Sequence, residues 1–532
     1  MAVQCPQRFV PMDYDLPRRH YSPLFDMTLV HAGKRLFKVH INHPEVGRDL
    51  WSRLRKVVER IEELDCWFGT PDIFSFLSSL GSAQNMKVFR LRNGADGARA
   101  NYWRGRQHVE LPAIFRGGLP SLREVGLTTT VTWAPGLFRG LRSFEFGAGP
   151  RIPFSPTHFL DVLRESPMIE SVRLIGDCPR LNKKPPVVAL LSLKDCALIG
   201  DGATYLIWYL DIPASANVFL SGPPPLGSEM ELHQFQDLYR APNLHILDRV
   251  SVVSFSIGFD TFKFWAQNES GGSLDLQVYS CGDPMTGLLP LYHFLARAFS
   301  DGVRGFKTAK EFVLHIERGV GRDDQKAVSN SVILTGFTSG APGLERIKLY
   351  GVPATALSLH LGHLCENRDA AVPFPDLQRL HVETTPIHSP KSLLEDLDRL
   401  LKRRQDLGVP LQSVYVKVNC ERLIPMTEHS AFLTAWEGLV GEDVEVEYSR
   451  DKVELPSWGQ LMNSLDEDSE EEGGEDEEGG EEDEEVGVAE DAGDGDLEWE
   501  SWISGRWPKA VSELRKQTGR DDHRATPVHR HH

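Results

Sequence analysis

The sequence lacks the long apolar runs that would place the protein in or across a membrane. No run of about 18 apolar residues occurs in the 532 residues, so the sequence predicts no transmembrane helix. The first residues contain no apolar stretch of the kind found in a signal peptide. We therefore expect a cytoplasmic or nuclear protein that is neither secreted nor bound to a membrane.

Cysteine is scarce, and no two cysteines form a Cys-x-x-Cys pair. An odd, scattered set in a chain that is not secreted predicts reduced and mostly buried thiols, because disulfide frameworks use paired cysteines in oxidising compartments. The seven cysteines are Cys5, Cys66, Cys178, Cys196, Cys281, Cys365 and Cys420.

The familiar catalytic motifs are also missing. The sequence has no P-loop, no G-x-G-x-x-G turn, no G-x-S-x-G elbow and no H-E-x-x-H pair. His360 and His363 near Cys365, and His40 with His43, are spaced as zinc ligands could be, but no further ligand pair is positioned by spacing. We interpret them as helix residues of a repeat. The prediction is a non-enzymatic protein with no catalytic residue, cofactor or metal, and an enzyme with an unrecognised motif is the alternative.

Negative charge is abundant in only one segment. The net charge is -18, yet residues 466–500 hold 21 Asp and Glu and no Lys or Arg. The rest of the chain sets 58 Lys and Arg against 55 Asp and Glu, so it is close to neutral. A nucleic-acid-binding domain would show a concentrated basic face, and none is present. We therefore expect no nucleic-acid partner.

The positive signal is a recurring phrase in which Leu-x-x-Leu-x-Leu often follows a proline. This is the form of a leucine-rich repeat, whose second half alternates with period two and so places its apolar side chains on one face of a short strand. A proline at the entry stops the preceding helix and costs the strand little. The phrases occupy Pro120–Leu127, Pro167–Leu174, Pro242–Leu247, Pro342–Leu349 and Pro375–Val382, and without proline Ile61–Cys66, Met86–Leu91, Leu141–Phe146 and Leu411–Val416.

Segments with apolar residues at helical spacing lie between the phrases, at Phe159–Arg164, Leu357–Leu364 and Ser392–Arg404. The alternation predicts an α/β fold, an irregular leucine-rich-repeat solenoid with a horseshoe of parallel strands and outer helices. A doubly wound α/β domain is the alternative, although no glycine-rich phosphate turn follows a strand. In the less regular part we expect strands at Asn217–Leu220, Val252–Ile257, Leu274–Tyr279 and Phe312–Glu317, and a helix at Leu288–Phe299.

The domain layout follows from these patterns. We expect an N-terminal extension at residues 1–23, the solenoid at 24–455, a disordered acidic segment at 456–500 and a Trp-rich and basic tail at 501–532. A division of the solenoid into two subdomains near 200–240 stays open. The acidic segment serves solubility or attracts a basic protein. The apolar face with Trp499, Trp502 and Trp507 either docks back on the solenoid or engages a partner groove.

The phrases LPSLREVGL, SPMIESVRL, APGLERIKLYGVP and FPDLQRLHVET resemble the large fungal families of F-box proteins with irregular leucine-rich repeats, over roughly residues 24–450. The resemblance implies an N-terminal F-box that binds the Skp-type linker of a cullin ubiquitin ligase, and repeats that present the substrate. The chain departs from the pattern where the box should open, because Leu16-Pro17 continues as Arg18-Arg19-His20. A Skp-type linker is therefore an expected partner only if a divergent F-box exists.

The predicted function is protein–protein interaction by a monomer, as the substrate-recognition part of an F-box-type receptor. The alternative is a scaffold without an F-box, or a binder of basic proteins through the acidic segment. In a solenoid the exposed residues between core positions of the strands select the partner. The candidate partner-binding residues are Arg123, Glu124, Glu170, Arg173, Glu345, Arg346, Lys348, Gln378, Arg379, Trp499, Trp502 and Trp507.

Overall fold

The computed structural model describes most of residues 34–449, and the longest gaps between the described segments cover 94–108, 223–242, 280–305, 317–340 and 362–373. All described residues belong to the first of two compact units, Met1–Met462. The expectations for residues 1–23, for the acidic segment, for the Trp-rich tail and for the helix at Leu288–Phe299 lie outside the described residues.

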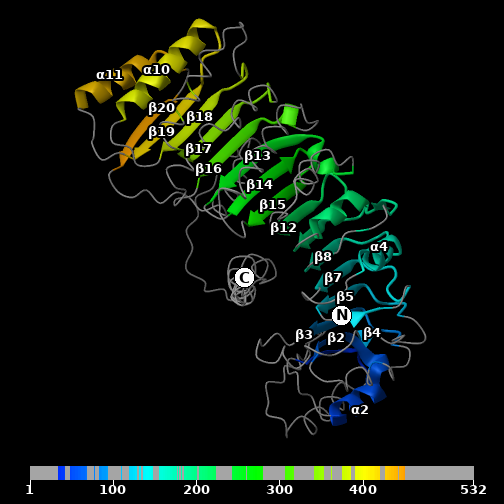
Figure 1. Cartoon of the computed structure of the whole chain (residues 1–532). Helices are drawn as coiled ribbons and strands as arrows, with labels where there is room; N and C mark the ends of the chain where they lie inside the picture. The colour runs from blue at the N-terminus through cyan, green and yellow to red at the C-terminus, as the bar shows by residue number, and fades with distance from the viewer. Residues whose placement is uncertain are drawn as a thin grey trace, which may run out of the picture. The chain divides into compact units, whose positions relative to one another are not determined.

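One large, mostly parallel sheet dominates the described part of the chain, so the expected α/β class is confirmed (Figure 1). Its sixteen strands lie in the order β1-β2-β3-β5-β7-β8-β10-β12-β15-β14-β13-β16-β17-β18-β19-β20. The strands of this sheet are β1 (Phe37–Ile41), β2 (Ile61–Phe68), β3 (Val88–Asn93), β5 (Glu124–Thr128), β7 (Ser143–Gly147), β8 (Ser171–Ile175), β10 (Asp195–Ile199), β12 (Asn217–Gly222), β13 (Val250–Ile257), β14 (Thr261–Asn268), β15 (Ser273–Tyr279), β16 (Glu311–Ile316), β17 (Arg346–Val352), β18 (Arg379–Thr384), β19 (Ser413–Asn419) and β20 (Asp443–Ser449).

Short elements and a few helices complete the described architecture. Two small parallel pairs are β4 (Val109–Glu110) with β6 (Val131–Thr132), and β9 (Val188–Ala189) with β11 (Leu210–Asp211). The α-helices are α2 (Arg48–Val57), α4 (Pro156–Arg164), α10 (Lys391–Asp406) and α11 (Met426–Glu437). The 3-10 helices are η1 (Val58–Arg60), η3 (Ala203–Tyr209), η5 (His245–Leu247) and η6 (Phe306–Thr308). None of the helices in the described ranges is long and apolar enough to span a bilayer.

Most of the recurring phrases form a tight turn followed by a strand, as their residue pattern predicts, whereas the described residues of Pro242–Leu247 form an isolated bridge at Leu244 and the 3-10 helix η5. The leading apolar residue closes the turn with a backbone bond, as in Leu377 N–H to Phe374 O at 3.1 Å, and it is buried. The two apolar strand positions that follow, Leu380 and Val382, are buried on the same side of β18. The alternation of the sequence therefore becomes one buried face and one polar face of the sheet.

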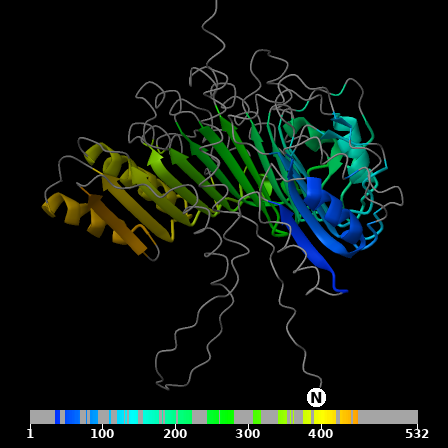
Figure 2. The same cartoon turned by 90° about the horizontal axis from the view of Figure 1, so that it is seen from below.

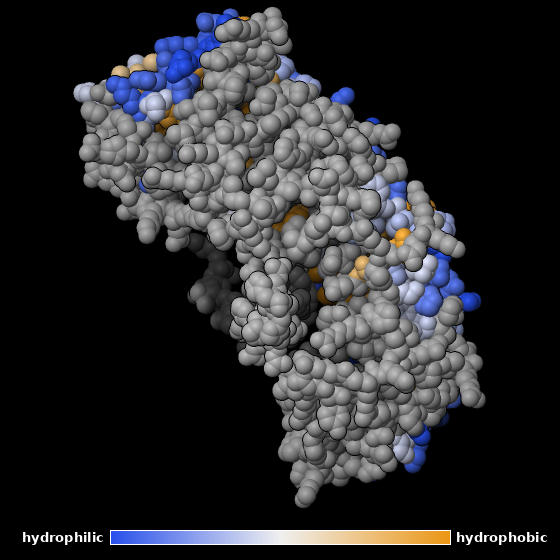
Figure 3. Space-filling view, viewed as in Figure 1, coloured by the Kyte–Doolittle hydropathy of each residue, from blue (hydrophilic) through white to orange (hydrophobic). Residues whose placement is uncertain are grey.

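The helices cover the buried face. The apolar residues of α10 lie at helical spacing, and Leu393, Leu397 and Leu400 all enter the same core as the strand residues. The helix α4 contributes Phe159 and Leu163 to that core. Figure 3 shows hydrophilic residues, in blue, on the outside around α10 and α11 and around α4. The helices predicted at Phe159–Arg164 and Ser392–Arg404 are confirmed within these elements.

The strand order follows the chain except at one place. Between β12 and β16 the chain makes a meander in which β15 pairs parallel with β12, β14 runs antiparallel to both β15 and β13, and β13 pairs parallel with β16. Figure 2 shows these strands within one continuous array. A doubly wound sheet grows in two directions from a central strand, whereas this order grows in one direction, so that alternative is wrong.

The strands predicted at Asn217–Leu220, Val252–Ile257 and Leu274–Tyr279 are confirmed within β12, β13 and β15, and the strand predicted at Phe312–Glu317 is confirmed as β16 up to Ile316. The antiparallel strand β14, the strand β10 and the helices α2 and α11 are additions that the repeated phrase does not indicate.

Candidate functional site

The candidate site is the face of the sheet that points away from the apolar core, here called the polar face. Because strands alternate, residues in register on neighbouring strands form rows across this face. The middle row runs from β1 to β20 through His40, Asp65, Arg90, Gly126, Glu145, Arg173, Ala197, Phe219, Asp275, Trp265, Ser254, Val313, Lys348, His381, Tyr415 and Glu445. Three zones of the row stand out, an ionic zone on β1–β5, a central zone on β10–β16 and an aromatic zone on β17–β20, and Glu145 on β7 and Arg173 on β8 lie between the first two.

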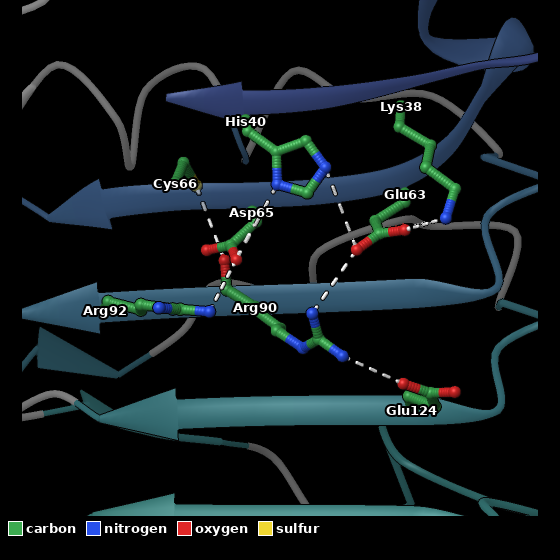
Figure 4. A network of polar contacts seen from close by, with 8 residues as sticks. All are labelled: Lys38, His40, Glu63, Asp65, Cys66, Arg90, Arg92 and Glu124. Atoms are coloured by element: carbon green, nitrogen blue, oxygen red, sulfur yellow. Dashed lines mark hydrogen bonds and ion pairs between the residues drawn. The ribbon is translucent and has the colours of Figure 1, made fainter. Parts of the chain in front are cut away.

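In the ionic zone, a buried glutamate ties four strands together (Figure 4). The carboxylate of Glu63 on β2 forms ion pairs with Lys38 Nζ of β1 at 2.9 Å and with Arg90 Nη1 of β3 at 3.3 Å. Arg90 also donates through Nη2 to Glu124 on β5, at 3.1 Å. Such a chain of alternating charges satisfies a carboxylate that would be costly to bury alone.

The second carboxylate of the ionic zone is Asp65, two residues after Glu63 on the same face of β2. Arg92 Nη2 donates to Asp65 Oδ2 at 2.8 Å, and His40 Nδ1 lies 3.9 Å from the same oxygen. Burial raises the pKa of Asp65 despite the opposing charges of Arg92 and Arg90. The neighbouring thiol of Cys66 is fully buried on the core side, and burial raises its pKa too, so it is an unreactive structural cysteine.

The central zone differs because apolar side chains lie on the polar face there. Ala197, Ile199, Trp265 and Val313 are all buried, yet they stand apart from the core cluster that contains their strand neighbours. They make a second, smaller apolar strip on the opposite side of the sheet from the core.

Asp275 on β15 lies in this apolar strip. Its register neighbours on the polar face are Phe219 on β12 and Trp265 on β14. Gln277 Nε2 donates to Asp275 Oδ2 at 3.2 Å, while Oδ1 is buried without a hydrogen-bond partner. Burial raises the pKa of Asp275 to about 7, against the lowering effects of the Gln277 hydrogen bond and the Lys263 charge.

A serine–histidine contact also lies in the central zone. Ser256 Oγ on β13 and His315 Nδ1 on β16 are 3.0 Å apart. A histidine beside a hydroxyl is the arrangement of an activated nucleophile. Both residues are buried, at 1% and 3% exposure, so a substrate carbonyl has no approach to this hydroxyl in the present structure. We interpret the pair as a cross-strand hydrogen bond that satisfies two buried polar groups.

In the aromatic zone, three rings form a column across three strands. The ring of His381 on β18 stacks on Tyr415 of β19 at 4.4 Å and contacts Tyr350 of β17 at 5.0 Å between centroids. His381 Nε2 lies 3.1 Å from Glu383 Oε1. Tyr415 donates its hydroxyl to Glu447 on β20 at 3.1 Å. Burial, and then the bond to Glu447, raise the pKa of the Tyr415 phenol, so it stays protonated at neutral pH.

The predicted partner-binding residues fall into two groups. Glu124, Arg173, Arg346, Lys348 and Arg379 lie on the polar face. Arg123, Glu170, Glu345 and Gln378 instead lie one residue before the strands, at the rim where the strands begin. Trp499, Trp502 and Trp507 lie outside the described residues.

Several of the predicted residues already have structural partners. Arg346 and Lys348 both pair with the buried Glu311, at 3.6 and 3.1 Å. Glu170 pairs with Lys194 and Arg142 of adjacent turns. Arg379, by contrast, is exposed on the polar face, so it is the most accessible cation of the predicted set there. Exposed ion pairs such as those of Glu170 contribute little to the free energy of unfolding, so their residues can still bind a partner.

Sequence reasoning missed the central and aromatic zones. The signal was the period-two alternation in FKFWAQN and SLDLQVY, which places Trp265 and Asp275 on the face opposite the core residues. The interpretation of His40 as a helix residue is wrong, because β1 alternates between core and polar face and His40 lies on the polar face. His43, His360, His363 and Cys365 lie outside the described residues. No group of three or more His, Cys, Asp or Glu in the described ranges is arranged to hold a metal ion.

Comparison with known proteins adds no relative to this picture. No protein-family model matches the chain, and no curated protein matches it.

Proposed function

We propose that the chain is a protein-binding solenoid of the irregular leucine-rich-repeat type, and that the polar face is its binding surface. The observation that carries the proposal is the polar face itself, where in-register charged and aromatic side chains of successive strands lie on both sides of the buried apolar strip in the central zone. Repeat proteins bind their partners through surfaces that successive repeats build side by side.

The composition of the polar face supports binding to a protein. Its two ends carry exposed charges, such as Arg92 and Glu445, while Trp265, His381 and Tyr415 lie between them. Protein interfaces are enriched in tryptophan, tyrosine and arginine at their centres and are more polar at their rims. The arrangement therefore fits a macromolecular partner that spans several strands.

The test of this proposal is site-specific cross-linking. A photo-reactive amino acid is placed at Arg379, exposed on the polar face, and as a matched control at Lys402, exposed on α10 on the other side of the sheet. We expect one partner to be cross-linked in cells at Arg379 and not at Lys402. Equal labelling at the two positions, or labelling at Lys402 alone, would contradict a binding role for the polar face.

The narrower role is substrate recognition within an F-box-type ubiquitin ligase. It rests on the family resemblance of the repeats and is tested by direct binding of the purified full chain to a Skp-type linker protein. Binding would support the ligase role, and we expect it to map to the residues before β1. Absence of binding would reject that role and would leave the polar face as the surface of a scaffold without ligase partners.

A further inference from the structure

We propose that the central zone of the polar face is an anchor for an arginine side chain of the protein partner, with Asp275 as its carboxylate and Phe219 and Trp265 as its flanking rings. This inference rests on the proposed function, because it names the chemistry of one position on the same binding surface.

The strand register places the carboxylate between the two aromatic residues, which is the arrangement that an arginine anchor requires. Asp275 pairs with Phe219 on one side and with Trp265 on the other, and all three lie on the polar face. Adjacent strands are about 4.8 Å apart, so the two aromatic residues are separated by roughly 10 Å with the carboxylate between them. A guanidinium group stacks on aromatic faces and donates two parallel hydrogen bonds to a carboxylate.

The zone also contains hydrogen-bond acceptors that nothing in the described structure uses. Asp275 Oδ1 is buried and accepts no hydrogen bond. The hydroxyls of Ser254 and Ser221, both at 0% exposure, also lack partners among the described residues. Ser221 pairs in register with Gln277 on the strand of Asp275, and Ser254 pairs with Trp265, which separates it from Asp275. A buried polar group without a partner is costly, and a ligand that supplies the missing donors recovers that cost.

A partner side chain has access to this place. Phe219, Lys263, Asp275 and Gln277 are each only partly buried, in contrast to the fully buried serines beside them. A long side chain with its charged group at the tip suits a carboxylate that lies below the surface beside the buried ring of Trp265.

The choice of arginine over lysine follows from donors and shape. A guanidinium has five N–H donors in a planar fork, which suits one carboxylate oxygen, neighbouring hydroxyls and two ring faces together. An ammonium has three donors, is more strongly hydrated and loses more on entering an apolar strip.

Lys263 is the charged group that acts on Asp275 among the described strands, and it stands on β14 in register with Gln277. His315 on β16 lies three strands from β15, and Asp195 on β10 lies two strands from it. Lys263 favours the ionised carboxyl, whereas the apolar surroundings disfavour it. Ionisation of Asp275 is needed for the salt bridge, so arginine binding is expected to strengthen as the pH rises through about 7.

The test is a ligand-observed NMR titration of the full chain with a capped glycine–serine peptide that carries one arginine. Peptides with citrulline or lysine in its place are the matched ligands. Citrulline keeps the shape of arginine and removes the charge. Salt of about 0.3 M suppresses binding to exposed carboxylates, because the Debye screening length of the solution is then only a few ångström.

We expect the arginine peptide to bind at pH 8 about tenfold more tightly than the citrulline peptide, since a charge-assisted bond of this type corresponds to that ratio. Asp275→Asn and Trp265→Leu should each remove the preference, and the pH dependence should vanish in Asp275→Asn. Glu395→Gln, which removes an exposed carboxylate of α10 on the other side of the sheet, is the control and should change nothing.

An undiminished arginine preference in Asp275→Asn would overturn the anchor, and so would equal binding of arginine and citrulline by the native chain. Neither outcome touches the proposed function, which the cross-linking at Arg379 decides independently. Stronger binding of the lysine peptide would also reject the assignment of arginine.

Discussion

Replacement of Asp275 by asparagine should stabilise the protein at high pH, and the pKa of this carboxyl sets the magnitude. The pKa rises from 3.8 to about 7 because the carboxyl lies in an apolar strip. A raised acid pKa means that the folded chain holds the proton more tightly than the unfolded chain does. The protonated Asp275 therefore makes its full contribution to the free energy of unfolding below pH 3.8, and this contribution is lost as the pH rises to about 7. Three units correspond to about 4 kcal/mol.

Two features reduce the measurable part of this energy. At pH 5 the unfolded carboxyl is already ionised, and water reaches the exposed part of the side chain. We therefore expect the free energy of unfolding of the native chain to fall by roughly 2 to 3 kcal/mol between pH 5 and pH 8 relative to Asp275→Asn. Asparagine keeps the acceptor for Gln277 Nε2 and carries no charge, so the variant should fold.

The assay is urea unfolding of both proteins across this pH range, comparing midpoints at equal slopes. Glu395→Gln serves again as the control, because Glu395 is exposed on α10 and the variant should show no such trend. A native chain and an Asp275→Asn variant with parallel pH profiles would refute the claim that Asp275 is held in an apolar environment.

Three further predictions concern the fold. Gly200→Ala should cost about 3 kcal/mol or more, because the position has a φ of +124° and the new Cβ would clash with the carbonyl oxygen of Gly176, directly after β8. Gly140→Ala, at +63° in open space, should cost only about 1 kcal/mol, and equal losses in urea unfolding would contradict the steric argument. Hydrogen bonding to Asp248 and Asp211 raises the pKa of His245. The protonated imidazole therefore stabilises the fold fully below pH 6.5, and this stabilisation declines as the pH rises through the raised pKa. A His245→Gln variant whose stability has the same pH profile as that of the native chain would contradict this. Leu397→Ala should cost about 2–5 kcal/mol as a buried core truncation, whereas Leu407→Ala, at 38% exposure, should cost less than about 1 kcal/mol; thermal unfolding that ranks them otherwise would be inconsistent with the core.

The repeated phrase and the helix periodicity determine much of the fold from sequence alone. In Pro375–Val382 the turn proline, the buried Leu377 and the alternating Leu380 and Val382 are local features, so they predict the entry turn and the inward face of β18 without knowledge of its neighbours. The apolar spacing of Ser392–Arg404 likewise predicts α10. These patterns work because side-chain direction in a strand or helix is a local property of the backbone.

Elements with weak local signals escaped the prediction. The strand β14 was missed because it belongs to a meander rather than to a repeat. The helix α11 has little segregation of apolar residues, so its sequence shows no clear helical periodicity.

The candidate site was decided by tertiary structure. The predicted strands contain Phe219 and Asp275 but not Trp265, and they do not make the three residues neighbours, because these stand on three different strands. Their adjacency depends on the pairing of β15 with β12 and β14, a matter of register between segments that a one-residue slip would abolish. Local pattern therefore determined which residues leave the core, and strand pairing alone determined which of them meet.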